Sequence, residues 1–202
     1  MPTVVIPFAG VTGKTRLHTS RRVRAELSIA MLGDVLAAAR AVGSVRVATS
    51  DPAGTREAEG AGAGVVADPG DGQGAAVAAA LQGLEPGRIL VVNADVPCVL
   101  PDDLRALLAA TPAGGMALVE ALDGTTNALS VSAPEQFEPV YGPNSAERFR
   151  ARAGSLGVEC VSVALPNVAD DVDTIDDLNR LHLRLGPRSQ MALASLAVES
   201  AQ

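Results

Sequence analysis

A short aliphatic run, Ile89–Val92, is followed at once by polar residues and prolines, and this arrangement limits the folds open to the chain. Four consecutive aliphatic residues are typical of a strand that is buried on both faces of a sheet. Asn93 and Asp95 come where that strand ends, and Pro101 stands where a helix can begin. In an open α/β sheet, the carboxyl end of a central strand lies in the crevice where ligands usually bind. Asp95 is therefore a candidate ligand-binding residue, and the alternative is a simple turn cap.

Strand-like and helix-like segments alternate along most of the chain. Strands are expected at 3–6, 45–49, 65–66, 89–92, 116–122, 127–131 and 159–165, and helices at 21–42, 75–84, 101–110, 145–153 and 175–185. The strands at 116–122 and 127–131 are joined by Asp123-Gly124, which is a hairpin signal. The sequence thus predicts a three-layer α/β/α Rossmann-like fold with a mostly parallel mixed sheet and a β-hairpin insertion.

Composition sets limits on size, partners and location. The 202 residues suffice for one domain, expected at 1–186, followed by a C-terminal tail at 187–202. Because only 2% of the residues are aromatic, the core must be aliphatic, and Cys98 and Cys160 are expected at buried apolar positions. The net charge of −7 argues against nucleic-acid and anionic-membrane partners. With no charged leader and no long apolar run, a cytoplasmic protein is expected, and a homodimer is compatible with the sequence.

The loop after the first strand, FAGVTGKTRL at 8–17, carries Lys14 and Arg16. Two cations, backbone N–H groups and a following helix N-terminus are suited to holding a polyphosphate. The GKT sequence at 13–15 copies the end of a P-loop, but that motif needs a glycine at position 8, where the chain has Phe8. A true P-loop is therefore disfavoured, and an ordinary solvated basic loop is the remaining alternative.

Two further groups of residues are candidates for ion binding. Asp171 and Asp173 are two positions apart, so on an extended segment their side chains share a face, and helix capping before Thr174 is the alternative. Ser145 opens a predicted helix, and a helix N-terminus with a free hydroxyl is suited to a small anion. The alternative there is a plain N-cap by Asn144 or Ser145.

Five segments occur in the order seen in one known family. They are the loop at 8–17, NADVP at 93–97, GTTNAL at 124–129, YGPNS at 141–145 and DDVDTIDDL at 170–178. The chain resembles the 2-phospho-L-lactate and phosphoenolpyruvate guanylyltransferases of coenzyme F-420 biosynthesis, over all but its C-terminal end. The resemblance implies a nucleotidyltransferase fold and transfer of GMP from GTP to phosphoenolpyruvate or 2-phospho-L-lactate, with release of pyrophosphate.

The resemblance also implies roles for single residues. Lys14 and Arg16 would neutralise charge on the pyrophosphate leaving group. Asp95 would be catalytic with these two cations and would hold Mg²⁺ together with Asp171 and Asp173, since hard carboxylate oxygens suit this ion. The implied nucleotide-binding residues are Phe8, Gly10, Lys14, Arg16, Gly72 and Gly74, and the implied acceptor-binding residues are Thr126, Gly142, Ser145 and Arg148.

Three positions depart from the family pattern, and they keep two other functions open. Ala9, Gly74 and Phe149 stand where the family commonly has Lys, Asn and His, which affects one phosphate contact and the recognition of base or ribose. One rival is a nucleotidyltransferase for another acceptor, such as a sugar phosphate or a molybdopterin cofactor. The other is a nucleotide-binding regulatory domain without catalysis. Between the two acceptors of the family, the Ala-rich composition and the GPNSAERF segment favour phosphoenolpyruvate.

Overall fold

The structure is a computed structural model that describes residues 1–11, 17 and 19–199, without the side chains of 196–199. Within these residues the chain forms one seven-stranded sheet of order β3-β2-β1-β4-β6-β5-β7. Its strands are β1 (Thr3–Pro7), β2 (Ser44–Ala48), β3 (Gly64–Val66), β4 (Ile89–Val92), β5 (Met116–Glu120), β6 (Thr126–Val131) and β7 (Cys160–Ser162). Only β6 runs antiparallel to its neighbours. The predicted mostly parallel mixed sheet with a β5–β6 hairpin is confirmed.

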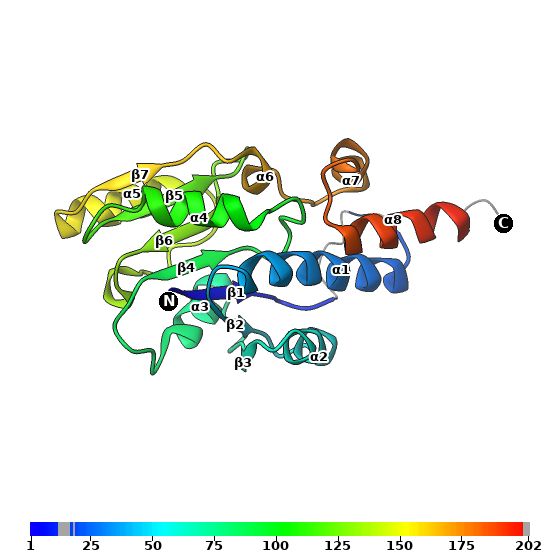
Figure 1. The fold of residues 1–202 in the computed structure, drawn as a ribbon, viewed down its shortest axis with the longest axis horizontal. Coiled ribbons are helices and arrows are strands. Elements are labelled where there is room, and N and C mark those ends of the chain that lie inside the picture. Colours follow the sequence, from blue (N-terminus) through cyan, green and yellow to red (C-terminus); the bar gives the residue numbers. More distant parts are fainter. Residues whose placement is uncertain (12–16, 18, 200–202) are drawn as a thin grey trace.

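Helices cover both faces of this sheet, which gives the predicted three layers (Figure 1). One face is covered by α1 (Arg21–Arg40), α2 (Pro52–Gly60), α4 (Pro101–Ala110) and the short α6 (Pro166–Ala169). The other face is covered by α3 (Gln73–Leu81) and α5 (Ser145–Leu156), with the 3-10 turn η2 (Pro134–Gln136) nearby. The last two helices, α7 (Ile175–Leu181) and α8 (Pro187–Glu199), lie beside α1. No helix in the described ranges is long and apolar enough to cross a membrane.

Side chains of the central strands alternate between the two apolar layers. In β4 all four residues are buried, as the sequence predicted. Leu90 and Val92 pack toward α1 and α4, whereas Ile89 and Val91 pack toward α3 and α5. Burying one such aliphatic side chain stabilises the fold by about 1.5–3 kcal/mol relative to exposure. The strand that leads to Asp95 is therefore fixed from both sides.

The predicted strand at 159–165 is shorter in the structure than in the sequence analysis. The strand β7 ends at Ser162, and the backbone N–H of Val163 makes one more bond, to Leu118 O at 2.9 Å. Pro166 then begins α6, which the sequence analysis did not predict. The α6 turn leads directly into the acidic segment at 170–173.

A buried carboxylate fixes α8 to α1. Asp34, in α1, is 5% exposed and accepts hydrogen bonds from the backbone N–H groups of Arg188 at 3.0 Å and Ser189 at 2.8 Å. These groups belong to the first turn of α8, where the helix itself offers no acceptor. Gly186 packs so closely on Asp34 that a Cβ would not fit there. The segment expected to be a tail thus contains a packed helix, and the domain boundary at residue 186 stays a prediction.

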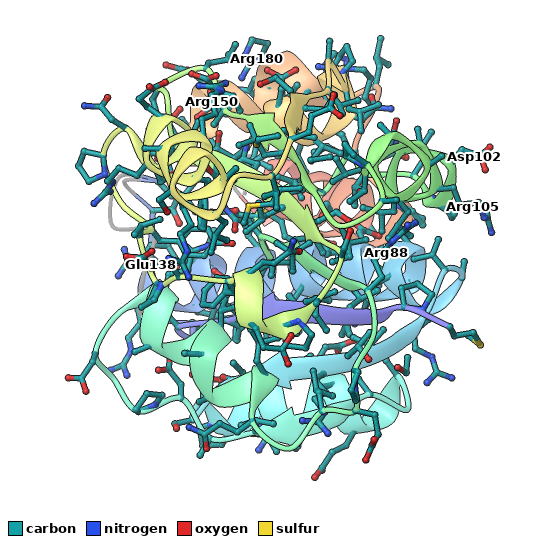
Figure 2. The ribbon with its side chains drawn as sticks, turned by 90° about the vertical axis from the view of Figure 1, so that its left-hand side faces the viewer. Arg88, Asp102, Arg105, Glu138, Arg150 and Arg180 are labelled. Atoms are coloured by element: carbon teal, nitrogen blue, oxygen red, sulfur yellow. The ribbon has the colours of Figure 1, made fainter. Side chains whose placement is uncertain are left out.

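We expect Asp34→Ala to lower the free energy of unfolding by about 2 kcal/mol, because two first-turn N–H groups of α8 lose a charged acceptor. Urea unfolding followed by circular dichroism measures this change. The control is Asp102→Ala, since the carboxylate of Asp102 is 91% exposed on α4 and pairs with Arg105 at the surface (Figure 2). That variant should unfold like the wild type. Equal stability of the two variants would show that Asp34 does not anchor α8.

Candidate functional site

Three carboxylates meet at the carboxyl end of β4. Asp95 follows this strand, and Asp171 and Asp173 lie on the segment between α6 and α7. One carboxylate oxygen of each residue lies within 4.8 Å of those of the other two, and all three residues are half-buried. The structure therefore brings together the three acids that the resemblance assigned to Mg²⁺, and we name them the acid cluster.

A backbone hydrogen bond joins the two segments that carry the acid cluster. The N–H of Val172 donates to the carbonyl oxygen of Asp95 at 2.9 Å. The side chain of Val172 is fully buried among apolar residues of α7 and α1. Because side chains alternate along an extended segment, Asp171 and Asp173 then face the other way, toward Asp95. This role of Val172 was not predicted, although an apolar residue between two acids is a signal for it in the sequence.

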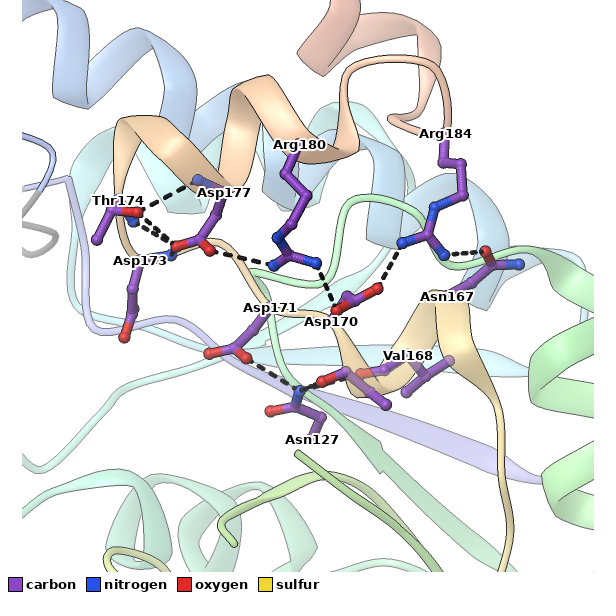
Figure 3. Close-up of polar contacts among 11 residues, drawn as sticks. Asn127, Asn167, Val168, Asp170, Asp171, Asp173, Thr174, Asp177, Arg180 and Arg184 are labelled. Atoms are coloured by element: carbon purple, nitrogen blue, oxygen red, sulfur yellow. Dashed lines mark hydrogen bonds and ion pairs between the residues drawn. The ribbon is translucent and has the colours of Figure 1, made fainter. Parts of the chain in front are cut away.

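The start of α7 fixes the backbone of Asp173. Thr174 caps the helix by accepting from the N–H of Asp177 at 3.2 Å, and the two residues form a capping box. The Asp177 carboxylate in turn accepts from the N–H groups of Thr174 at 2.9 Å and Asp173 at 3.2 Å (Figure 3). The capping residue is thus Thr174, and the Asp173 carboxylate lies in the acid cluster instead.

The acid next to the cluster, Asp170, is neutralised by two arginines. Its carboxylate pairs with Arg180 at 2.8 Å and with Arg184, and Figure 3 shows it between their guanidinium groups. Burial alone would raise the pKa of Asp170, but the hydrogen bonds from the two arginines outweigh this effect and lower it. Asp170 is therefore a structural ion-pair partner, and its charge does not add to that of the acid cluster.

The carboxylate of Asp171 is influenced by its burial and by its neighbours in the acid cluster. Burial raises the pKa of Asp171, and the nearby charge of Asp95 raises it further. A hydrogen bond from the amide of Asn127 acts in the opposite direction. A cation among the carboxylates would remove this repulsion, and hard oxygen donors suit Mg²⁺ or Mn²⁺. The donor set thus fits a divalent cation.

A cavity of about 440 Å³ lies beside the acid cluster, between the ends of β1 and β4 and the loop before α3. This volume is in the range of small-ligand sites. Of the predicted nucleotide-binding residues, Phe8, Gly10 and Gly72 line the cavity, as does Asp95. Lys14 and Arg16 lie outside the described residues. Their contacts with a nucleotide, like those of the lining residues, stay predictions.

The predicted nucleotide-binding residue Gly74 does not line this cavity. It lies in the first turn of α3, where a Cβ would come within 2.8 Å of Cβ and O of Pro139. Close packing against Pro139 is therefore sufficient to require glycine at this position, independently of any ligand. Its role in nucleotide binding stays a prediction.

The beginning of the first loop is held by α2. The Asp51 carboxylate caps this helix by accepting from the N–H groups of Ala53 at 2.8 Å and Gly54 at 2.9 Å. Its other oxygen accepts from the N–H of Val11 at 3.2 Å. Gly10 has a φ of +108°, and a Cβ there would also collide with Asp51, so this position requires glycine. The cavity wall formed by the loop is thus built on a helix cap.

The predicted acceptor-binding residues gather where β6 begins and α5 begins. Ser145 Oγ donates to Thr126 Oγ1 at 3.1 Å, and both residues are buried. Gly142 has a φ of +111°, and the guanidinium of Arg148 donates to Pro143 O at 2.8 Å. The structure brings these four residues together, and their contact with an acceptor stays a prediction.

The side chain of Asn144 does not cap α5, so a plain N-cap by Asn144, one alternative to anion binding here, is not observed. Asn144 adopts a left-handed conformation with a φ of 57° and makes no capping bond. The first N–H groups of the helix are bonded to backbone instead, from Ser145 to Gly142 O and from Ala146 to Gly124 O. The loop is thus shaped by its own backbone.

The fold and the acid cluster first define the class of protein. Residues 22–169 match the family model of the MobA-like NTP transferase domain, so the chain is a nucleotidyltransferase of this class. Its fold is similar to that of a solved nucleotidyl transferase from Methanothermobacter thermautotroptrophicus, with a TM-score of 0.64 and 19% identity over 96% of this chain and 99% of that one. This second likeness concerns the fold alone.

Relatives that align with nearly the whole chain define the family. Phosphoenolpyruvate guanylyltransferase of Streptomyces scabiei (strain 87.22) is 36% identical over 97% of both chains. The enzyme of the same name from Roseiflexus castenholzii (strain DSM 13941 / HLO8) is 38% identical over 93% of both. The chain belongs to the phosphoenolpyruvate guanylyltransferase family, which confirms the resemblance seen in its sequence.

Proposed function

We propose that this protein transfers GMP from GTP to the phosphate of phosphoenolpyruvate and releases pyrophosphate, as a step of coenzyme F-420 biosynthesis. Membership of the family supports this reaction, and the names of the relatives favour phosphoenolpyruvate over 2-phospho-L-lactate. The observation that carries the proposal is the acid cluster beside a cavity of small-ligand size. An enzyme that transfers a nucleotidyl group needs both a cavity and a charged site beside it, because it must bind a polyphosphate and stabilise the charge that develops on the phosphates.

The acid cluster is the part of the site that would hold Mg²⁺. When bound, the ion would neutralise phosphate charge during an in-line displacement at phosphorus. Asp95, Asp171 and Asp173 would supply its protein ligands, and the bond from Val172 to Asp95 holds the two ligand-bearing segments together. Metal ligation thus gives one chemical reason for placing three acids so close together.

The displacement itself needs little proton chemistry from the protein. A phosphate oxygen of the acceptor attacks the α-phosphorus of GTP, a new P–O bond forms, and the bond to the bridging oxygen breaks with its electrons leaving on pyrophosphate. No general base is required, because the attacking phosphate is already ionised at neutral pH. Lys14 and Arg16 would stabilise the leaving pyrophosphate.

The remaining predicted residues would bind the two substrates. Phe8, Gly10 and Gly72 would contact the nucleotide, since glycine permits close backbone approach at the cavity wall. The acceptor's carboxylate and phosphate would bind at Thr126, Gly142, Ser145 and Arg148. A cytoplasmic location and a homodimer are further parts of the proposal.

Pyrophosphate release tests the reaction against its rivals. We expect turnover with GTP, phosphoenolpyruvate and Mg²⁺ together, and loss of turnover when EDTA removes the metal. The comparison nucleotides are the other nucleoside triphosphates. The comparison acceptors are 2-phospho-L-lactate, 3-phosphoglycerate and a sugar phosphate. Turnover only with a sugar phosphate would contradict the proposal. Tight GTP binding without any turnover would favour a regulatory domain.

We expect Asp95→Asn to lower the rate of GMP transfer by about 1000-fold, because the cluster loses one anionic ligand that the transition state depends on. The protein should still fold, since the amide keeps the shape of the side chain. The matched control is Asp102→Asn, which changes an exposed acid on α4 and should leave the rate unchanged. A folded Asp95→Asn variant with the wild-type rate would exclude Asp95 as a metal ligand.

A further inference from the structure

Three side-chain amides form a continuous chain from the cavity to the acid cluster. Gln73, at the start of α3, donates from Nε2 to Oδ1 of Asn93 at 2.6 Å. Asn93, just after β4, donates from Nδ2 to Oδ1 of Asn127 at 3.1 Å. Asn127, in β6, donates from Nδ2 to Oδ1 of Asp171 at 3.4 Å, and Figure 3 shows this last contact. We name Gln73, Asn93 and Asn127 the amide chain.

Main-chain carbonyl groups fix the direction of the whole amide chain. Nδ2 of Asn127 also lies 3.0 Å from Val168 O and 3.2 Å from Ala169 O, so its two hydrogens are shared among these carbonyl oxygens and Oδ1 of Asp171. Because a carbonyl oxygen can only accept, the nitrogen of Asn127 must face these two groups, and its oxygen must face Asn93. Nδ2 of Asn93 donates to Thr126 O at 3.3 Å, which fixes the second amide in the same sense.

The orientation of the two asparagines determines which atoms are presented at both ends of the amide chain. Since Asn93 presents its oxygen to Gln73, Gln73 must offer its nitrogen there. At the other end, only a donor is directed at Asp171, so a carboxylate is the group that suits this position. Figure 3 shows the second oxygen of Asp171 pointing away from Asn127. Reversing any one amide would place oxygen against oxygen along the chain.

The cost of burying the Asn127 amide indicates a role beyond packing. Asn127 is 1% exposed, and the next residues of β6, Ala128 and Leu129, are apolar core residues. A buried amide is unfavourable unless all its bonds are made, and a fully bonded one is held rigidly in low dielectric surroundings. The backbone also aligns the two asparagines, because Asn93 N donates to Asn127 O at 2.9 Å. Such rigidity is useful where a ligand must be oriented.

We propose that Asn127 and Asn93 are positioning residues of the metal site: Asn127 orients the Asp171 carboxylate within the acid cluster, and Asn93 holds Asn127 and connects it to the cavity wall at Gln73. This inference rests on the proposed function for the presence of a divalent cation. It assigns to the amide chain the role that donors behind a metal ligand commonly have, in which they fix the ligand's orientation and support its charge.

Mn²⁺ binding to the full chain without substrates tests the proposal, with the dissociation constant measured by electron paramagnetic resonance. We expect Asn127→Ala to weaken Mn²⁺ binding about tenfold, and Asn93→Ala to weaken it less but in the same direction. The matched control is Ser130→Ala, which removes another buried polar group of β6, bonded to Thr111 at 2.7 Å. It should leave Mn²⁺ binding unchanged even where thermal unfolding shows a loss of stability.

The outcome is readable even where a variant folds poorly. If Asn127→Ala does not fold, the proposal is tested by comparing the Mn²⁺ dissociation constant of Asn93→Ala with that of Ser130→Ala. Folded variants that bind Mn²⁺ within about twofold of the wild type would overturn the proposal. So would an equal loss in Ser130→Ala, or a wild type that does not bind Mn²⁺. Failure of the guanylyltransferase reaction is seen separately, as a wild type that binds Mn²⁺ but does not release pyrophosphate with phosphoenolpyruvate.

Discussion

The hydrogen bond from Val172 N to Asp95 O, at 2.9 Å, is the contact on which the site depends. It joins the end of β4 to a segment that arrives only after the hairpin, α5, β7 and α6. Burial of the Val172 side chain sets which face of that segment turns inward, so the acids on either side turn toward Asp95. If the segment moved by one residue, the valine would enter the site and the acids would enter the core. The apolar contacts of α7 with α1 therefore preserve the geometry of a polar site.

The same region shows how the fold tolerates a concentration of negative charge. Asp170 is paired with Arg180 and Arg184, and the capping box satisfies Asp177 within α7. Within the acid cluster, burial together with the charge of Asp95 raises the pKa of Asp171. Asp95 and Asp171 thus repel each other at a place where a divalent cation would be useful. A cation between these two carboxylates would relieve the repulsion while the apolar packing keeps them close together.

Local patterns predicted the parts of the structure that depend on local sequence. The buried strand Ile89–Val92, the Asp95 that follows it and the spacing of Asp171 and Asp173 were all readable, because strand burial and side-chain alternation have short periods. The contacts that complete the site have no such signature. Asn127 reaches Asp171, and Asp34 caps α8, only through the tertiary fold. The predicted tail and Gly74 are two more features that local sequence could not explain, since residues far away in sequence set the packing of each.

A crystal structure of the full chain with Mn²⁺ and GTP tests the central claim most directly, because anomalous scattering locates Mn²⁺ independently of the protein density. The account predicts a strong anomalous peak bound by carboxylate oxygens of Asp95, Asp171 and Asp173, with the nucleotide phosphates next to it and the nucleoside in the cavity near Gly72. A peak bound elsewhere, with these three carboxylates free of metal and GTP in place, would contradict it.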